Sequence, residues 1–347
     1  MTGCLEPMIA PGWQQVLLVA CVAAVVSAVG ILLIRPLLLK HALAKPNARS
    51  SHRVPTPQGA GIAVIAATLV VAGAVLFGTW DEFTALVLFG ATVFIAALGF
   101  ADDLKPVQVL PRLVLQAIAV GAVVLVSTCD DLRIAPFIPI WIERALLVLA
   151  GLWFVNLVNF MDGLDWITAA EVIPVTAALA MLGVQGDVPR IATIIAAALC
   201  GGLIGFAPFN RPVAKIFLGD VGSLPIGLLL GWCLLQLAAQ HHLAAALLLP
   251  LYYLADATVT LLRRMMRGEP FWIAHRSHFY QRATDNGFAV MQVVGEVFAL
   301  NLLLAALALT SIAMRSIAAD AMCLALGAVA VALVLFRFSR PRKIVAV

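Results

Sequence analysis

Two amides and two carboxylates stand three residues apart in the segment NLVNFMDGLD, which closes a long apolar run. They are Asn156, Asn159, Asp162 and Asp165. On a helix, residues with this spacing form one slowly drifting stripe. Polar groups near a bilayer are costly, and those that persist line a cavity, pair with each other or hold an ion. No Lys or Arg lies between Arg144 and Arg190, so a metal ion or a distant basic loop is expected to neutralise the carboxylates. A structural role, in which the amides bond neighbouring helices, explains the Asn better than the Asp.

Two further motifs carry acids at the ends of apolar runs. GFADDLK places Asp102 and Asp103 directly after such a run. A solvated helix cap is one explanation, but acids at a helix C-terminus oppose the helix dipole, so stability alone does not favour them there. KIFLGDVGS sets Asp220 between two glycines, with Lys215 five residues earlier. A turn of this kind is common, and it suits the presentation of one carboxylate to an ion.

Two loops supply positive charge. Segment 45–61 holds Arg49 and His52 among prolines and small residues, which indicates either a phosphate-binding loop or a basic segment attracted to anionic lipid headgroups. Segment 263–288 interleaves Arg and His with aromatic residues. Interfacial anchoring and metal binding by its two His are alternatives there, but the surrounding charge favours phosphate oxygens. Its candidate phosphate ligands are His275, Arg276 and His278.

The acidic and basic motifs together indicate phosphoryl-transfer chemistry. Mg²⁺ prefers oxygen ligands and is usually held by one or two carboxylates plus substrate phosphates. Arg and His side chains stabilise phosphoryl oxygens. The sequence therefore predicts transfer between a soluble nucleotide and a membrane-embedded acceptor, provided that the motifs lie on the same side of the membrane.

The elements that must position these motifs are membrane-spanning helices. The chain has 347 residues, of which 63% are hydrophobic and 12% charged, with a mean hydropathy of +1.05. A soluble domain would carry about twice that charge fraction. Because one span needs roughly 20 apolar residues, we predict an all-α, polytopic integral membrane protein with ten or eleven transmembrane helices in a single domain, residues 1–347. The candidate spans are 14–34, 61–79, 84–101, 112–128, 141–159, 167–184, 191–208, 223–239, 243–262, 289–313 and 321–336.

The distribution of Lys and Arg predicts on which side of the membrane each loop lies. With the N-terminus outside, the inner loops and the C-terminal tail hold 18 of the 22 Lys and Arg residues, as the positive-inside rule requires. The C-terminus is then cytoplasmic, and the first span is expected to be retained because no basic region precedes it. Asp256, inside span 243–262, is predicted to pair with Arg263 or Arg264. The predicted cytoplasmic loops, which carry all the motifs above, are 35–60, 102–112, 160–166, 209–222 and 263–288.

The ordered set GFADDLK, NLVNFMDGLD, KIFLGDVGS and AHRSHFYQ resembles the polyprenyl-phosphate N-acetylhexosamine-1-phosphate transferases, also called family 4 glycosyltransferases. The resemblance runs from Pro46 to His278. PNARSSHRVPTP and AHRSHFYQR look most like the bacterial branch that starts O-antigen or related surface polysaccharides, and less like the peptidoglycan branch. The resemblance implies an inner-membrane enzyme with a cytoplasmic active site, which transfers a sugar 1-phosphate from a UDP-N-acetylhexosamine to undecaprenyl phosphate and releases UMP.

The resemblance also implies roles for individual residues. Asn159 and Asp220 would bind Mg²⁺, with Mn²⁺ as an alternative ion. Asp102 and Asp103 would position or deprotonate the lipid phosphate. The implied substrate-binding residues are Arg49, His52, Asn156, Asp162, Asp165, Lys215, His275, Arg276 and His278. The implied partners are the two substrates and membrane lipid; nucleic acid is not expected, and a homodimer is compatible with the resemblance.

Three positions depart from the family pattern. Ala44 replaces a common acid, Ala60 interrupts a Gly-Gly pair, and Trp166 stands where Gly commonly follows the second Asp of DGLD. Trp166 is expected to reshape the sugar or nucleobase pocket, so the sugar is left open among GlcNAc, GalNAc, QuiNAc and FucNAc.

Two rival functions and one alternative mechanism remain. A prenyltransferase would need two DxxxD-type clusters, and a transporter would bury its polar residues near the midplane of broken helices. Direct attack by the lipid phosphate is favoured over an aspartyl-phosphate intermediate, because a phosphate monoester with a second pKa near 6 hardly needs a strong base.

Overall fold

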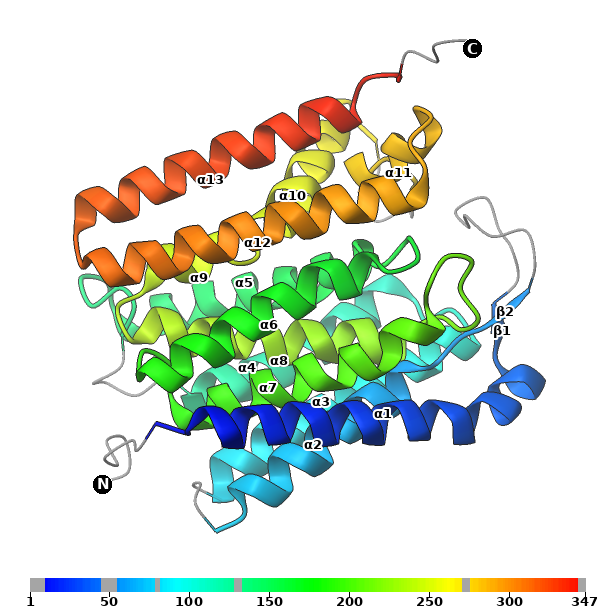
Figure 1. Ribbon diagram of the computed structural model, residues 1–347, viewed down its shortest axis with the longest axis horizontal. Coiled ribbons are helices and arrows are strands. Elements are labelled where there is room, and N and C mark those ends of the chain that lie inside the picture. Colours follow the sequence, from blue (N-terminus) through cyan, green and yellow to red (C-terminus); the bar gives the residue numbers. More distant parts are fainter. Residues whose placement is uncertain (1–9, 45–54, 79–81, 128–132, 270–274, 343–347) are drawn as a thin grey trace.

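The computed structural model describes residues 10–44, 55–78, 82–127, 133–269 and 275–342, which fold into a bundle of helices (Figure 1). Within these ranges, nine helices are long and apolar enough to cross a membrane. They are α1 (Trp13–His41), α3 (Glu82–Leu104), α4 (Val109–Ser127), α5 (Ile140–Phe160), α6 (Ile167–Gln185), α7 (Arg190–Phe206), α8 (Asp220–Ala239), α12 (Val290–Met314) and α13 (Ile317–Phe338). The prediction of an all-α polytopic membrane protein is confirmed.

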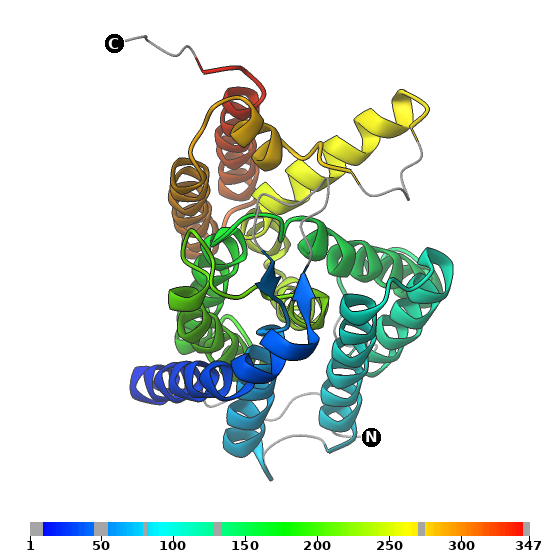
Figure 2. The ribbon, with the colours of Figure 1, turned by 90° about the vertical axis from the view of Figure 1, so that its right-hand side faces the viewer.

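Two of the eleven predicted spans take a different form. The span predicted at 61–79 is the shorter helix α2 (Gly61–Leu76). The span predicted at 243–262 is broken into α9 (Leu243–Leu248) and α10 (Leu251–Met266), with Pro250 at the junction. Proline lacks the backbone N–H that a continuing helix needs. In Figure 2 the yellow α10 runs across the view, whereas α12 and α13 are seen nearly end-on.

Helices α6, α7 and α8 form the buried centre of the bundle. Helices α1 and α2 pack on α7, while α3 and α5 pack on α8. The backbones of α2 and α8 approach so closely that a Cβ atom added at Gly61 would lie 2.2 Å from Cα of Gly222. Small residues allow such contacts between membrane helices, and this contact brings the start of α2 against the start of α8.

The polar motifs gather at one end of the bundle, on the right in Figure 1. A small antiparallel sheet of β1 (Leu43–Ala44) and β2 (Thr56–Pro57) lies there. The chain after β2 pairs with the segment before α8, since Gln58 bridges Phe217 and the N–H of Gly59 donates to Phe217 O at 3.1 Å. The short helices η1 (Ala207–Phe209) and α11 (Phe279–Asp285) complete the described elements. The start of α1 and the end of α13 lie at opposite ends of the bundle; which end faces the cytoplasm stays a prediction.

Candidate active site

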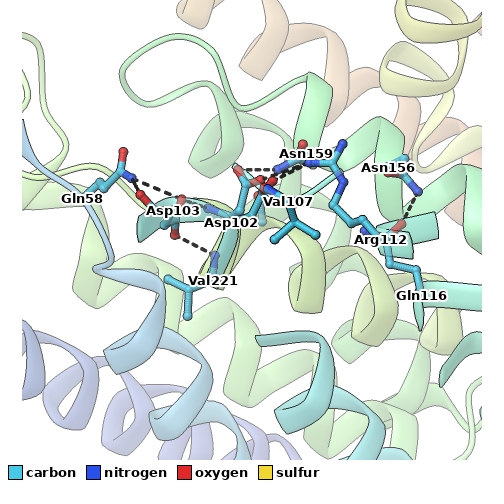
Figure 3. Close-up of polar contacts among 11 residues, drawn as sticks. Gln58, Asp102, Asp103, Val107, Arg112, Gln116, Asn156, Asn159 and Val221 are labelled. Carbon is cyan, nitrogen blue, oxygen red and sulfur yellow. Dashed lines mark hydrogen bonds and ion pairs between the residues drawn. The ribbon is translucent and has the colours of Figure 1, made fainter. Parts of the chain in front are cut away.

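Asp103 joins the end of α3 to the start of α8 (Figure 3). Its Oδ1 accepts the backbone N–H of Asp220 at 2.9 Å, and its Oδ2 accepts the N–H of Val221 at 3.1 Å. These are N–H groups that a helix leaves without internal partners, and a carboxylate there also complements the helix dipole. Gly219, with φ +78°, makes the turn into α8. Asp103 therefore fixes the place where the Asp220 side chain emerges.

Asp102 is held by a different set of partners. Its Oδ2 forms an ion pair with Arg112 of α4, and its Oδ1 accepts the N–H of Val107 at 2.6 Å. The same Arg112 nitrogen lies 4.0 Å from Asp220 Oδ2. The Asp102 side chain is 10% exposed and that of Asp220 is 30% exposed, so Asp220 is the more accessible carboxylate. Arg112 was predicted only as a loop charge, and the sequence did not reveal its bridging position; its one signal was its place in the short segment after the Asp pair.

Asn159, in the last turn of α5, reaches the same cluster. Its Nδ2 donates to Asp220 Oδ1 at 2.8 Å and to Ser223 Oγ at 2.9 Å. The two residues predicted to bind the metal are therefore in direct contact, although 61 positions separate them. Ser223, one turn after the start of α8, is a further member that the sequence analysis did not single out.

The cluster fits a divalent cation that arrives with a phosphate ligand. Asp102 and Asp220 lie beside the guanidinium of Arg112, and Asp103 lies close to Asp220, so the cluster has an excess of negative charge. In the part of the chain that the structure describes, no group of three or more His, Cys, Asp or Glu is arranged to hold a metal ion. Asp220 and the amide oxygen of Asn159 offer hard ligands, and Mg²⁺ commonly takes one or two such protein ligands with substrate oxygens.

Asn156 occupies a different environment from Asn159. It is buried, and its Nδ2 donates to Gln116 Oε1 and to Leu152 O, both at 2.8 Å. The contact with Gln116 links α5 to α4 (Figure 3). The structure thus places Asn156 within the helix packing beside the cluster, and its role in substrate binding stays a prediction.

Asp162 and Asp165 lie in the turn that follows α5. Asp162 accepts a hydrogen bond from the Thr168 hydroxyl, and burial raises the pKa of Asp162 to about 7, with the charge of Asp103 as a smaller contribution. Asp165 is buried, and its Oδ2 accepts the N–H of Ala214 at 3.0 Å. Asp165 thereby fastens the segment that leads to Asp220.

Trp166 fastens the same segment a second time. It has φ +66°, a left-handed conformation that is uncommon for a residue other than Gly. Its backbone N–H donates to Asn210 Oδ1 at 2.7 Å, and its indole N–H donates to Ala207 O at 2.5 Å. The exposed Lys215 belongs to this segment, and its backbone N–H donates to Phe209 O at 2.9 Å.

The basic motif lies beside the end of α5. The rings of His275 and His278 are 4.9 Å apart. Arg276 pairs with Asp285 at 3.3 Å. The Tyr280 hydroxyl donates to Phe160 O at 2.9 Å, so the start of α11 is attached to the helix that carries Asn159. Arg49 and His52 lie outside the described residues.

Asp256 has a partner other than the one predicted. His278 Nδ1 lies 3.3 Å from its Oδ1. Arg264 instead pairs with Glu269 at 2.9 Å, and Arg263 lies over the Phe279 ring at 4.7 Å. The prediction looked one to two turns ahead along one helix, whereas the chain after α10 returns and brings a residue 22 positions away onto the carboxylate.

The sequence profile of glycosyl transferase family 4 matches residues 85–238. This segment contains Asp102, Asp103, Asn159 and Asp220, the residues that the fold brings together. This segment, slightly under half of the chain, is similar to glycosyl transferase family 4.

Three relatives illustrate the similarity of this chain to bacterial transferases. A "Probable undecaprenyl-phosphate N-acetylglucosaminyl 1-phosphate transferase" of Bacillus subtilis (strain 168) is 24% identical over 300 residues, 81% of this chain and 83% of that protein. The phospho-N-acetylmuramoyl-pentapeptide-transferase of Caldanaerobacter subterraneus subsp. tengcongensis is 32% identical over 190 residues, 50% of this chain and 58% of that protein. The enzyme of the same name from Neisseria gonorrhoeae (strain FA 1090) is 30% identical over 212 residues, 51% and 58% of the two chains. The match thus spans less than two thirds of the length of these pentapeptide transferases.

Proposed function

We propose that this protein transfers an N-acetylhexosamine 1-phosphate from a UDP-sugar to undecaprenyl phosphate and releases UMP. The observation that carries the proposal is the contact between Asn159 and Asp220, with Asp102, Asp103 and Arg112 around it, at one end of a membrane-spanning bundle. The name of the Bacillus subtilis relative gives undecaprenyl phosphate and N-acetylglucosaminyl 1-phosphate, and the UDP carrier comes from the resemblance of the sequence motifs. The reaction takes place at the cytoplasmic face of a bacterial inner membrane, where the positive-inside distribution puts these residues.

In this mechanism, Asn159 and Asp220 would hold Mg²⁺, or Mn²⁺ in its place, and the bound ion would neutralise charge on the diphosphate of the UDP-sugar. Asp220 is suited to this because its side chain is 30% exposed and its second oxygen, Oδ2, lies as far as 4.0 Å from Arg112. Arg112 offers a guanidinium to a phosphate oxygen, a group for which Arg is well shaped. His275, His278 and Lys215 bind the remaining phosphate oxygens, and Arg49 and His52 bind the lipid phosphate.

Direct attack by the lipid phosphate oxygen on the β-phosphorus is the route that the hydrogen bonds favour. Hydrogen bonds and ion pairs stabilise the negative charge of a carboxylate and so lower its nucleophilicity. Both oxygens of Asp103 accept N–H groups of α8, and both oxygens of Asp102 are engaged by Arg112 and Val107. We therefore assign Asp102 and Asp103 to positioning of the acceptor side rather than to a covalent intermediate. Exchange of labelled UMP into the UDP-sugar without lipid would contradict this route.

We place the reaction at the start of O-antigen or related surface-polysaccharide synthesis. The support is the relative named for N-acetylglucosaminyl 1-phosphate transfer, which matches 81% of the chain. The second candidate is the peptidoglycan step, because relatives named for phospho-N-acetylmuramoyl-pentapeptide transfer reach 32% identity over half of the chain.

A donor panel tests the proposal and separates the two branches. Purified protein in lipid is given undecaprenyl phosphate, Mg²⁺ and one UDP-sugar at a time: the GlcNAc, GalNAc, QuiNAc, FucNAc and N-acetylmuramoyl-pentapeptide derivatives. We expect UMP release with one of the first four donors. Release with the pentapeptide donor alone would move the protein to the peptidoglycan branch, and release with none of them would refute the proposed function.

A further inference from the structure

Asp256 is the centre of a buried polar network behind the basic motif. Its side chain is fully buried in α10. Both oxygens serve as acceptors, and the donors come from two separate parts of the chain. Within α10 they are the hydroxyls of Tyr252 and Thr260, each at 3.3 Å. From the segment that begins α11 they are His278 Nδ1 at 3.3 Å, Phe279 N at 3.0 Å and Tyr280 N at 3.1 Å.

The stability of α10 does not require a buried carboxylate, nor one that accepts hydrogen bonds from five donors. Charge inside a membrane protein is expensive unless it is paired and hydrogen-bonded, and where it persists it marks function. Three of the five donors belong to the AHRSHFYQ motif. These three residues lie 22 to 24 positions after Asp256 in the sequence. The network therefore fixes the motif on α10.

The contact with His278 has a chemical consequence for the imidazole ring. The two ring nitrogens are distinct, and the hydrogen bond made by one decides what the other can do. A carboxylate can only accept, so the nitrogen facing Asp256, Nδ1, carries a proton. Nε2 is then left for a ligand, and in a doubly protonated ring it could donate Nε2–H to a phosphate oxygen while Asp256 balances the charge. The ring stacks between Phe160 and Tyr280, with centroids at 6.3 and 5.9 Å, which restrains its rotation.

The same carboxylate also acts on the end of α5. Asp256 holds the Tyr280 backbone, and the Tyr280 hydroxyl donates to Phe160 O at 2.9 Å. Phe160 directly follows Asn159, whose amide contacts Asp220. Asp256 thus orients His278, a predicted phosphate ligand. Through Tyr280 it also supports the end of α5, which carries Asn159, a predicted metal ligand.

We propose that Asp256 is a positioning residue of the phosphoryl-transfer site: it holds His278 with Nδ1 protonated and Nε2 directed to substrate phosphate, and it fixes α11 against α5. This inference rests on the proposed function, because it assigns His278 to a phosphate. It adds a residue inside the bundle that acts only through its neighbours.

The direct test reads the ring of His278 without any substrate. Protein labelled with ¹⁵N-histidine in lipid is measured by solid-state NMR at alkaline pH, and the His278 signals among the six His are assigned by their loss in His278→Gln. We expect the neutral ring to carry its proton on Nδ1. A proton on Nε2 in the unaltered protein would overturn the proposal whatever the turnover, so this result is independent of whether the proposed function is correct.

Turnover in matched variants gives the second test. Asp256→Asn keeps the size but places N–H donors against the N–H groups of α11, whereas Thr260→Val removes one donor to Asp256 within α10 and leaves the motif untouched. We expect Asp256→Asn to lower kcat/KM by about 10- to 100-fold, as loss of an orienting partner does, and to abolish the Nδ1-protonated state. Thr260→Val should stay within about threefold of the unaltered protein. Equal losses in both variants, or a retained tautomer and turnover in Asp256→Asn, would show that the network only packs the bundle. Absence of UMP release from the unaltered protein would instead count against the proposed function.

Discussion

Asp103 and Asp220 are joined by a hydrogen bond of 2.9 Å from the Asp220 backbone N–H to the Asp103 carboxylate, across 117 positions of sequence. The other carboxylate oxygen takes the N–H of Val221. Asp103, which the family pattern implies as catalytic, therefore caps helix α8, and α8 begins with Asp220, which that pattern implies as a metal ligand. The geometry of the cluster depends on this cap as much as on the charges.

Asp103→Asn should lower both stability and turnover. An amide offers one acceptor atom and a donor group, so one of the two α8 N–H groups loses its partner. Loss of a helix cap costs about 1 kcal/mol, which thermal unfolding in lipid or detergent measures as a lower Tm. Asp187→Asn, an exposed-loop acid paired with His242 at the other end of the bundle, serves as the control and should leave turnover unchanged. An unchanged Tm in Asp103→Asn would contradict the capping role.

Asp220→Asn should separate chemistry from folding. The amide oxygen can still accept from Asn159, so the fold is retained, but the charge that holds the cation is removed. We expect kcat to fall by about 10²–10³, the range for removal of one electrostatic contact to a transition state, with little change in Tm. Ser223→Ala, which removes the other acceptor of the Asn159 amide, should cost far less. Turnover at the unaltered rate in Asp220→Asn is the result that refutes a metal-binding role.

Arg112 should matter for both the acceptor phosphate and the fold. Arg112→Gln leaves the 10% exposed Asp102 without its cationic partner and removes the positive charge near Asp220. A hydrogen bond to a charged group contributes about 1.5–3 kcal/mol, so we expect a lower Tm together with a higher KM for undecaprenyl phosphate. Arg112→Lys keeps the charge and should restore much of the KM. If Arg112→Gln has the same KM for the lipid as the unaltered protein, the guanidinium has no part in binding it.

The contact between Gly61 and Gly222 should tolerate no side chain. A Cβ atom at Gly61 would lie 2.2 Å from Gly222 Cα, so α2 and α8 would have to separate. Overpacking of this kind costs about 1–3 kcal/mol, and the shift would also disturb Asp220 at the start of α8. Gly90→Ala in α3 is the matched control, because an added Cβ there meets nothing within 4 Å. Thermal unfolding and UMP release should both be reduced in Gly61→Ala and unaffected in Gly90→Ala.

Much of the fold follows from the sequence because a bilayer imposes a simple rule. Long apolar runs must be helices, since the hydrocarbon offers no partner for a backbone N–H or C=O, and nine of the predicted spans meet this rule in the described residues. The break at Pro250 could have been predicted, because the proline stands inside the run LLLPLYYL. The prediction rested on hydropathy alone, and hydropathy does not register a helix break at a single proline.

The candidate site was less predictable because its contacts join distant segments. The acids of the three motifs were singled out by their cost near a membrane, and the structure brings Asp102, Asp103 and Asp220 together. Arg112 looked like any loop cation, and its role as a bridge depends on the packing of α4 beside α3. Asp165 has a contact that its motif did not reveal: its Oδ2 accepts the N–H of Ala214 in another loop, and the substrate-binding role that the family resemblance implies stays a prediction.

Trp166 is the position at which we expect a change in sugar preference. Its left-handed backbone suits Gly, and its indole ties the turn after α5 to Ala207. Trp166→Gly removes the tie and relieves a conformation that costs about 1–3 kcal/mol, so stability should change little. We expect the ratio of kcat/KM values between UDP-sugars to shift by about tenfold, the scale of one pocket contact. An unaltered ratio across the donor panel would exclude Trp166 from selectivity.

The most direct test of the central claim follows the β-phosphate itself. A UDP-sugar that carries ³²P in the β-phosphate and ³H in the sugar is incubated with undecaprenyl phosphate, Mg²⁺ and either the unaltered protein or Asp220→Asn. We predict that both labels enter the lipid fraction in equal amounts, that unlabelled UMP stays in the aqueous fraction, and that Asp220→Asn transfers both labels about 10²–10³ times more slowly. Transfer of ³H without ³²P, or equal transfer by Asp220→Asn, would contradict the account.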